Sequence, residues 1–355
     1  MDKETYERQK AFAGEKKPSM KRRFVGHDYT RRSMYMVTME TEGRRPLLGQ
    51  VVGRSDAPND SAEAPRTVLS ELGQLVASEW EAISSYHSEI SVVALQIMPD
   101  HLHGILFVKR AMQQPLGIVL RGFKQSCNKH YRELVLGRGS VGSDMSVALP
   151  TQQTGNRPVK KDRRGEDRSH GMLFARGYND SVLLRDGQLG RWLHYLEDNP
   201  RRLLMKREKP EWLRPFFNFA YGTHVYSGVG NRALLNAPQR LAVRISRRLT
   251  ETQLKTEVER YLEAARHGAV LISPAISPGE KLVMRQAFDL HLPTIVIMEN
   301  GFQPLSKPHG EQFYACSEGR LLMLSAWEHH NERRPLTAYQ CQQMNLMALE
   351  LSSGA

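Results

Sequence analysis

Two apolar runs separated by a single Pro-Asp turn most constrain how this chain folds. ISVVALQIM (90–98) is typical of a buried strand, and HLHGILFV (101–108) has the length and composition of its antiparallel return strand. Side chains alternate between the two faces of a strand, so His101 and His103 point the same way while Leu102 points to the opposite face. We therefore expect a sheet that carries two imidazoles close together on one face.

Two imidazoles on one face of a strand are near enough to bind one divalent ion. The alternative is a pair of partly buried histidines that are hydrogen-bonded to their neighbours. Two histidines do not complete a metal site, because catalysis at a metal needs open positions for substrate and water and enough protein ligands to hold the ion. A third ligand from elsewhere in the chain is therefore expected if His101 and His103 bind a metal.

The rest of the first 219 residues reads as mixed α/β structure. We expect a basic, flexible N-terminus over 1–24. Periodicity predicts a strand at 33–40, a neighbouring strand at 46–53 joined to it by TEGRR, and helices at 67–86, 115–136 and 187–198, the last ending at Asn199-Pro200. Residues 137–170 are rich in Gly, Ser, Asn and Gln and contain KKDRRGEDR, so they predict a basic loop insertion. Lys160 and Lys161 would lie along a nucleic-acid backbone if this loop is more than a solvated surface segment.

A second domain is expected over 220–355. The stretches GAVLISP, PTIVIME and GRLLMLSAW read as buried strands, and ISPGEKLVMRQAFDL between the first two reads as a turn and a helix. Strand–helix–strand order with buried apolar strands favours a parallel, Rossmann-like sheet. The basic segment 240–267, which precedes it, is expected to be helical.

Composition limits the partner and the compartment. The 355 residues include 50 Lys and Arg against 38 Asp and Glu, a formal charge of +12, which favours a polyanionic partner through phosphate neutralisation. No apolar run approaches the roughly 20 residues that span a bilayer. The three cysteines are far apart in the sequence and predict neither a disulfide framework nor a zinc site. We expect a cytoplasmic protein of two domains with no membrane partner.

Two motifs resemble one family. IMPDHLHGIL resembles the His-hydrophobic-His motif of the HUH endonucleases, and more narrowly that of the single-tyrosine transposases of the insertion-sequence and REP-associated type. HYLEDNP resembles the Tyr-hydrophobic-x-x-Asn/Gln context of the catalytic tyrosine in that family, and ARGYNDSVLLRDGQLGRWL resembles the stretch before it. The resemblance covers about residues 25 to 215 apart from the insertion at 137–170.

This resemblance implies a fold and a mechanism. The fold is a ferredoxin-like or RRM-like α/β domain with an antiparallel central sheet over 25–219. Tyr195 would be the nucleophile, and Asn199 would join His101 and His103 as the third ligand of Mg²⁺ or Mn²⁺. The implied activity is a metal-dependent endonuclease and strand transferase, a transposase, that acts on single-stranded or hairpin DNA through a 5′-phosphotyrosine intermediate. Lys124 and Arg202 are candidate DNA contacts.

The residues leave alternatives open for this site. Tyr131, on the helix that follows the histidine strand, is a second candidate nucleophile. Asn199 precedes Pro200, so it would otherwise be the N-cap of a new helix with proline at its first position. The alternative function is a non-catalytic nucleic-acid-binding protein that keeps the fold. A phosphoesterase with two His-x-Thr/Ser motifs lacks the second motif in this chain.

The C-terminal domain loosely resembles a known Rossmann-like group. GAVLISPAISPGEKLVMRQAFDLHLPTIVIMENGF is similar to the fold of DNA-processing protein A and the lysine-decarboxylase-like proteins. Ser277, Gly279 and free backbone N–H groups at the start of the predicted helix would suit an anion. The alternative is a scaffold or dimerisation domain without a ligand, so a homodimer is among the arrangements we expect.

Overall fold

The computed structural model describes residues 24, 26–137, 171–332 and 334–353. By their contacts these residues form two compact units, the N-terminal unit (residues 24–204) and the C-terminal unit (residues 205–353). The sequence suggested a boundary at 219/220, whereas the contacts divide the chain between Leu204 and Met205. The expected flexible N-terminus, apart from Phe24, and the insertion with Lys160 and Lys161 lie outside the described residues.

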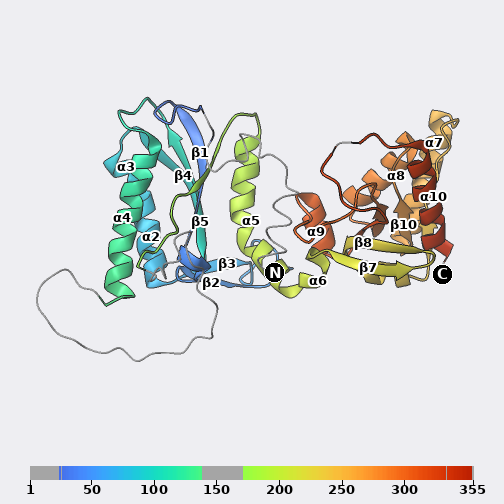
Figure 1. The fold of residues 1–355 in the computed structure, drawn as a ribbon, viewed down its shortest axis with the longest axis horizontal. Coiled ribbons are helices and arrows are strands. Elements are labelled where there is room, and N and C mark those ends of the chain that lie inside the picture. Colours follow the sequence, from blue (N-terminus) through green and yellow to red (C-terminus); the bar gives the residue numbers. More distant parts are fainter. Residues whose placement is uncertain (1–23, 25, 138–170, 333, 354–355) are drawn as a thin grey trace, which may run out of the picture. The chain divides into compact units, whose positions relative to one another are not determined.

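The N-terminal unit is built around a four-stranded antiparallel sheet of order β4-β5-β1-β6 (Figure 1). The strands β4 and β5 are joined by the Pro99-Asp100 turn, as the sequence predicts. The elements of this unit are β1 (Ser33–Glu40), η2 (Glu42–Arg44), β2 (Gly49–Val52), β3 (Arg66–Leu69), α2 (Glu71–Glu81), α3 (Ile83–Tyr86), β4 (Ile90–Met98), β5 (His101–Val108), α4 (Leu116–Leu134), β6 (Asn179–Val182) and α5 (Gln188–Glu208), whose last turn belongs to the C-terminal unit.

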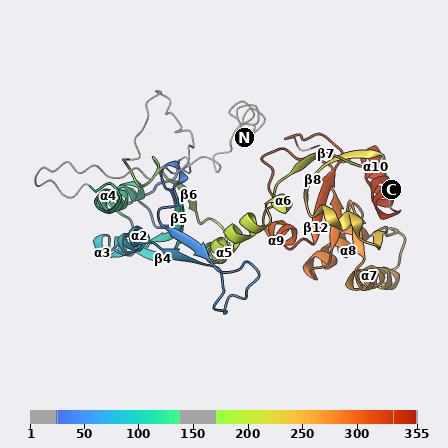
Figure 2. The ribbon, with the colours of Figure 1, turned by 90° about the horizontal axis from the view of Figure 1, so that it is seen from below.

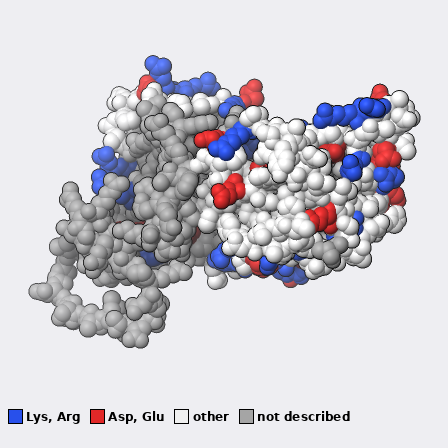
Figure 3. All heavy atoms as spheres, turned by 45° about the vertical axis from the view of Figure 1, so that its right-hand side comes forward, with Lys and Arg blue, Asp and Glu red and all other residues white. Residues whose placement is uncertain are grey.

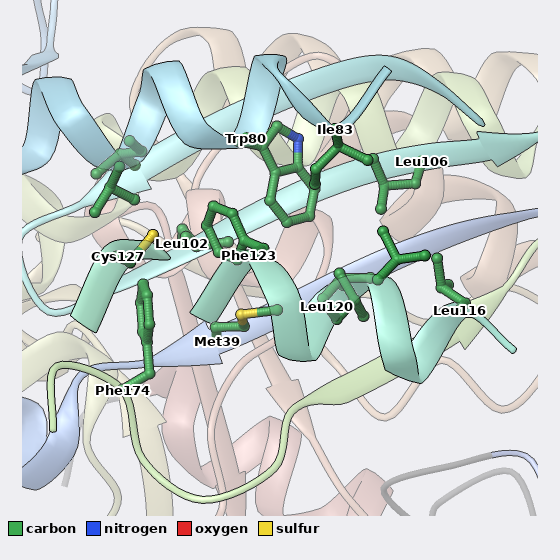
Figure 4. Packing of buried hydrophobic residues seen from close by; sticks show 14 of the residues in the cluster. Met39, Trp80, Ile83, Leu102, Leu106, Leu116, Leu120, Phe123, Cys127 and Phe174 are labelled. Carbon is green, nitrogen blue, oxygen red and sulfur yellow. The ribbon is translucent and has the colours of Figure 1, made fainter. Parts of the chain in front are cut away.

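Helices cover both faces of this sheet. On one face α2 and α4 pack on β1 and β5 through a core that includes Trp80, Leu102 and Phe123 (Figure 4). On the other face Trp192 and Leu196 of α5 pack on Ile105 of β5. Figure 1 shows α5 on the opposite side of the sheet from α2 and α4. The alternation of side chains along β5 therefore sends its even-numbered residues to α2 and α4 and its odd-numbered residues to α5.

Three expected elements differ in the N-terminal unit. The 46–53 segment does form a strand, but β2 pairs with β3 in a separate two-stranded sheet, and β1 pairs with β5 and β6. Residues 67–69, expected to begin a helix, belong to β3. Helix α2 starts after Ser70, whose side chain accepts a hydrogen bond from the Gly73 backbone N–H. The helix at 187–198 does not end at Asn199-Pro200, because α5 continues through Pro200 to Glu208.

The C-terminal unit contains a six-stranded sheet of order β7-β8-β12-β11-β10-β9. The strands β9 to β12 run parallel to one another, as expected for 270–273, 294–297 and 321–325, whereas β8 joins β12 antiparallel. The elements are α6 (Pro210–Leu213), β7 (Phe216–Tyr221), β8 (His224–Gly230), η3 (Arg232–Asn236), β9 (Arg240–Ala242), α7 (Glu251–Arg266), β10 (Val270–Ser273), α8 (Pro278–Asp289), β11 (Thr294–Ile297), α9 (Glu311–Ser317), β12 (Leu321–Ser325) and α10 (Ala338–Ser353).

The segment 240–267 is only partly helical, because Arg240–Ala242 pairs with β10 as an edge strand and α7 begins at Glu251. Helix α10 packs on one face of the sheet, while α7 and α8 pack on the other (Figure 2). Both units are thus mixed α/β structures with antiparallel strand pairs and several helices. Within the described residues, no helix combines the length and apolarity required to cross a membrane.

Candidate active site

The candidate site lies on the face of the N-terminal sheet that α5 covers. His101 and His103 share this face with Ile105, which packs against Trp192 of α5. Leu102, between the two histidines, is fully buried in the opposite core. The two imidazole rings are 4.9 Å apart between centroids and nearly perpendicular, at 85°. The structure therefore confirms that both imidazoles lie on one face of the sheet.

His103 is held by its neighbour on the adjacent strand. Its Nδ1 is 2.8 Å from Oγ1 of Thr38, the residue paired with it on β1. Only 6% of His103 is exposed. Burial lowers the pKa of His103 to about 3, and electrostatic interactions with His101 and Arg44 act in the same direction. His103 is therefore neutral at physiological pH, and when Nδ1 donates to Thr38 its Nε2 lone pair remains for a ligand.

His101 is oriented by the residue before it. Its Nδ1 donates a hydrogen bond to Oδ1 of Asp100 over 2.6 Å. Burial alone would raise the pKa of Asp100, but the hydrogen bond from His101 and the charges of His101 and Arg44 outweigh burial and lower it. A carboxylate that accepts from Nδ1 fixes the ring orientation and leaves Nε2 as the ligand atom, as around many metal-bound histidines.

Tyr195 approaches this pair from α5. Its ring centroid is 5.4 Å from that of His103, with 71° between the ring planes, and 37% of the residue is exposed. The guanidinium of Arg202, two turns further along α5, lies 5.9 Å from the centre of the Tyr195 ring. The phenol is thus next to an imidazole, near a cation, and accessible from solvent.

Asn199 lies one helical turn after Tyr195 and is 6% exposed. It is interior to α5, so the alternative in which it caps a new helix at Pro200 is wrong. Its Nδ2 atom is buried and has no hydrogen-bond partner among the described residues. An unsatisfied buried amide costs about 1–3 kcal/mol, and rotation of the amide exchanges Nδ2 for Oδ1. Among the described residues, this end of the Asn199 side chain is therefore available to a further partner.

The donor set limits the kind of metal site. The described part of the chain contains no group of three or more His, Cys, Asp or Glu residues that could hold a metal ion. A site at this place would therefore use the two imidazoles of His101 and His103 with a neutral amide oxygen, for which Asn199 is the candidate. Imidazole and carbonyl donors suit Mn²⁺, and Mg²⁺ prefers oxygen donors and retains water ligands.

The other sequence candidates lie elsewhere. Tyr131 is fully buried in the α2–α4 core, where its hydroxyl accepts a hydrogen bond from Arg45, so it is unavailable as a nucleophile. The ammonium of Lys124 donates to the carbonyl oxygens of Ala175 and Gly177, at 2.6 and 2.7 Å, and so anchors the segment before β6. Sequence reasoning assigned no role to Thr38. Its role depends on the pairing of β1 with β5, and the sequence does not specify the register of that pairing.

The anion site expected at α8 is occupied by the protein itself. The side chain of Ser277 accepts a hydrogen bond from the Glu280 backbone N–H, and the Glu280 carboxylate accepts from the N–H groups of Ile276 and Ser277. This capping box places a buried carboxylate at the helix N-terminus. The N–H groups of Ile276, Ser277 and Glu280 are therefore bonded within the protein, contrary to the expectation for Ser277, and the Glu280 carboxylate would repel a second anion.

Comparisons with known proteins give remote likenesses only. No protein-family model matches the chain, and no curated protein matches it. A REP-associated tyrosine transposase bound to a REP hairpin is similar at 10% identity and a TM-score of 0.29, over 49% of this chain and 70% of the other. DNA processing protein A from Helicobacter pylori, solved for its single-stranded DNA binding mode, is similar at 20% identity and a TM-score of 0.28. This likeness covers 38% of this chain and 61% of the other. A Deinococcus radiodurans protein to which a transposase role is ascribed is similar at 13% identity and a TM-score of 0.26. This likeness covers 49% of this chain and 95% of the other. TM-scores this low carry no argument.

Proposed function

We propose that the chain is a metal-dependent single-stranded DNA endonuclease and strand transferase of the HUH tyrosine transposase type. In this proposal the N-terminal unit is the ferredoxin-like catalytic domain, and the C-terminal unit is a Rossmann-like accessory domain. The observation that carries the proposal is the meeting of Tyr195 with the histidine pair: the phenol lies beside His103, and His101 and His103 each have Nδ1 engaged and Nε2 left over.

In the proposed first step the Tyr195 oxygen attacks the phosphorus of a DNA phosphodiester. A bond forms between Tyr195 Oη and phosphorus, the bond from phosphorus to the 3′ oxygen breaks, and the phenol proton is lost as the 3′ oxygen gains one. The product is a 5′-phosphotyrosine with a free 3′-hydroxyl. A phenolate is both a nucleophile and a reasonable leaving group, so a 3′-hydroxyl can reverse the step and rejoin or transfer the strand.

The side chains around Tyr195 have separate parts in this step. His101, His103 and Asn199 would hold the divalent ion, which when bound neutralises charge on the non-bridging phosphate oxygens. Asp100 and Thr38 bind Nδ1 of the two rings, and so would leave each Nε2 as the atom that holds the ion. Arg202, beside the Tyr195 ring, adds positive charge where the phosphate must lie.

The alternative is a nucleic-acid-binding protein without catalysis. It would explain the net charge of +12. It gives no account of a buried histidine pair held in one orientation, or of an orphaned amide one turn from an exposed tyrosine. The catalytic proposal accounts for these features together.

The test is covalent trapping with pools of labelled single-stranded and hairpin DNA in Mn²⁺ or Mg²⁺. The wild-type protein should form an adduct on denaturing gels, and mass spectrometry should place the nucleotide on Tyr195. Tyr195→Phe keeps the ring against His103 but lacks the oxygen, so adduct and nicking should fall at least a thousandfold while DNA binding persists. Tyr86→Phe, at a phenol that is 79% exposed on α3, is the matched control and should react normally. Normal cleavage by Tyr195→Phe, or a nucleotide on another tyrosine, would contradict the proposal.

A further inference from the structure

A cavity of about 380 Å³ lies at the N-terminal end of the helix that carries Tyr195. Its lining comes from β6, from the loop after β6, and from the first turn of α5, together with the ring of Phe24. The volume is in the range of small-molecule sites in proteins. No role in the mechanism above has been given to this cavity.

Part of the cavity wall is the loop between β6 and α5, and side-chain hydrogen bonds hold this loop in place. The side chain of Gln188 accepts hydrogen bonds from the backbone N–H groups of Leu184 and Arg185, and donates one to the carbonyl of Val182. These three contacts fix the loop between β6 and α5. The side chains of Leu184 and Arg185 are therefore held out over the cavity on a braced loop, and both residues are exposed.

Two guanidinium groups line the cavity without a carboxylate partner. Within the described residues, neither Arg185 nor Arg191 has a side-chain hydrogen bond or ion pair. Many other arginines are paired with an acid, among them Arg44, Arg54, Arg201, Arg260, Arg266, Arg285, Arg320 and Arg334. The positive end of the α5 dipole adds to the potential at the same place. As far as the described part of the chain goes, the cavity thus offers an anion two cations that no acidic side chain neutralises.

The remaining lining suits a nucleobase. Phe24 and Leu184 supply apolar surface at 37% and 63% exposure, against which an aromatic base can pack. Asp180, whose carboxylate accepts a hydrogen bond from the Tyr29 hydroxyl, and Ser181 supply polar groups for a base edge. The Asp180 carboxylate repels a phosphate and the two guanidinium groups attract one, so the lining favours the phosphate beside the arginines and the base beside Asp180.

The cavity lies one helical turn before the proposed nucleophile, because Arg191 of its lining precedes Tyr195 on α5. Arg191 and Tyr195 are four residues apart on α5, so their side chains lie on one helix face, about 6 Å apart along the axis. A strand that presents its scissile phosphate to Tyr195 can therefore place a neighbouring nucleotide in the cavity.

We infer, on the basis of the proposed function, that this cavity is a binding site for one unpaired nucleotide next to the phosphodiester that Tyr195 attacks. Arg185 and Arg191 hold its phosphate, and the base enters between Phe24, Leu184 and Asp180. The site therefore selects for an unpaired flank beside the cleavage position.

The test compares two double variants of the full-length protein. Binding of a fluorescent 12-nucleotide single strand of alternating dA and dC is measured by anisotropy across a salt series. Arg185→Ala/Arg191→Ala should weaken binding by roughly tenfold to thirtyfold at 0.1 M salt. It should also reduce the slope of log K against log salt by about 0.7, because the two arginines together neutralise one phosphate and each neutralised single-strand phosphate contributes about 0.7. Arg121→Ala/Arg132→Ala removes the same charge from exposed positions of α4, and should change the affinity by less than about threefold.

Hydrogen exchange of the wild-type protein provides the second readout. The same 12-mer should protect the backbone amides of residues 179–189, and this protection should be absent in Arg185→Ala/Arg191→Ala. Equal weakening by the two double variants, or no protection of 179–189, overturns the inference.

Adduct formation separates this inference from the proposed function. If the wild-type protein forms the Tyr195 adduct while the cavity variant binds and reacts as wild type does, only the cavity assignment fails. If no adduct forms but the cavity variant alone loses binding, the nucleotide site stands and the catalytic proposal fails.

Discussion

At the scale of single residues, His103 combines burial with a hydrogen bond to Thr38, and this combination governs how the N-terminal unit responds to acid. The folded protein holds the pKa of His103 at about 3, below the usual value of about 6.5. Between these two values the unfolded chain binds a proton that the folded chain does not. The free energy of unfolding therefore falls as the pH falls from about 6.5 toward 3.

We predict that His103→Asn reduces this loss of stability. Between pH 7.5 and pH 4.5 the wild-type protein should lose roughly 2–3 kcal/mol more than the variant, at about 1.4 kcal/mol per pH unit. Urea unfolding followed by circular dichroism, in EDTA to exclude metal, measures the difference. The exposed His194 replaced by Asn serves as the control and should follow the wild type. The same pH dependence in His103→Asn and the wild-type protein would show that His103 is not the buried neutral group described above.

The site residues differ in how far the sequence could predict them. The two histidines were placed on one face by the alternation of a strand alone, and that placement is correct. The likeness of HYLEDNP to a known motif suggested Tyr195, and only the packing of α5 on the sheet brings its ring to His103. Thr38 could not be found, because its contact with His103 depends on which strand lies beside β5 and in what register.

At the scale of elements, the strands β4 and β5 were predicted to the residue, because a Pro-Asp turn punctuates two apolar runs. Residues 67–69 were mispredicted because Leu69 and Leu72 also satisfy helical spacing. In the structure residues 67–69 pair with β2 as a strand, and the Ser70 cap starts the helix only after them. At Pro200 the error was the opposite, because a helix end was predicted where the helix continues. Proline usually ends a helix, yet this one is buried inside α5, between apolar side chains that pack on strands.

The crossing of α2 over β5 leads to a prediction about one glycine. A Cβ built on Gly104 would lie 2.0 Å from the indole of Trp80, which is fully buried and cannot move aside. Gly104→Ala should therefore destabilise the N-terminal unit by roughly 3 kcal/mol or more, in line with overpacking of well-filled cores. Gly122→Ala, on the exposed side of α4 with open space around it, should instead stabilise it by about 0.5–1 kcal/mol. Thermal unfolding of both variants checks the pair, and a harmless Gly104→Ala would mean that the indole does not lie against β5.

At the scale of the whole molecule, Figure 3 shows Lys and Arg in several separate groups on the face that it presents, with Asp and Glu scattered among them. The net charge of +12 therefore favours a polyanionic partner but does not indicate where on the surface such a partner would bind. The parallel strands β10, β11 and β12 were predicted from their apolar runs, whereas β9 lies in a segment that was expected to be helical. The antiparallel strand β8 was missed, because HVYSGVG carries two glycines and only a weak strand signal.

Each unit has its own buried core, and this leads to a prediction about separation. The site residues His101, His103, Tyr195 and Asn199 all precede Leu204, and α5 ends at Glu208. A protein shortened to residues 24–208 keeps the sheet, all of α5 and the cavity at its start. A cut near Phe219 would instead leave part of β7 without β8, its partner in the C-terminal sheet.

We expect the 24–208 protein to fold and to form the Tyr195 adduct at a rate within about tenfold of the full chain, because every group assigned to the chemistry is present. Its DNA affinity should be lower if the C-terminal unit binds phosphates, and the salt slope then falls by about 0.7 for each phosphate that the shorter protein no longer neutralises. Circular dichroism establishes folding before the adduct is assayed. A folded 24–208 protein that forms no adduct, beside a full chain that does, would show that the C-terminal unit supplies part of the site.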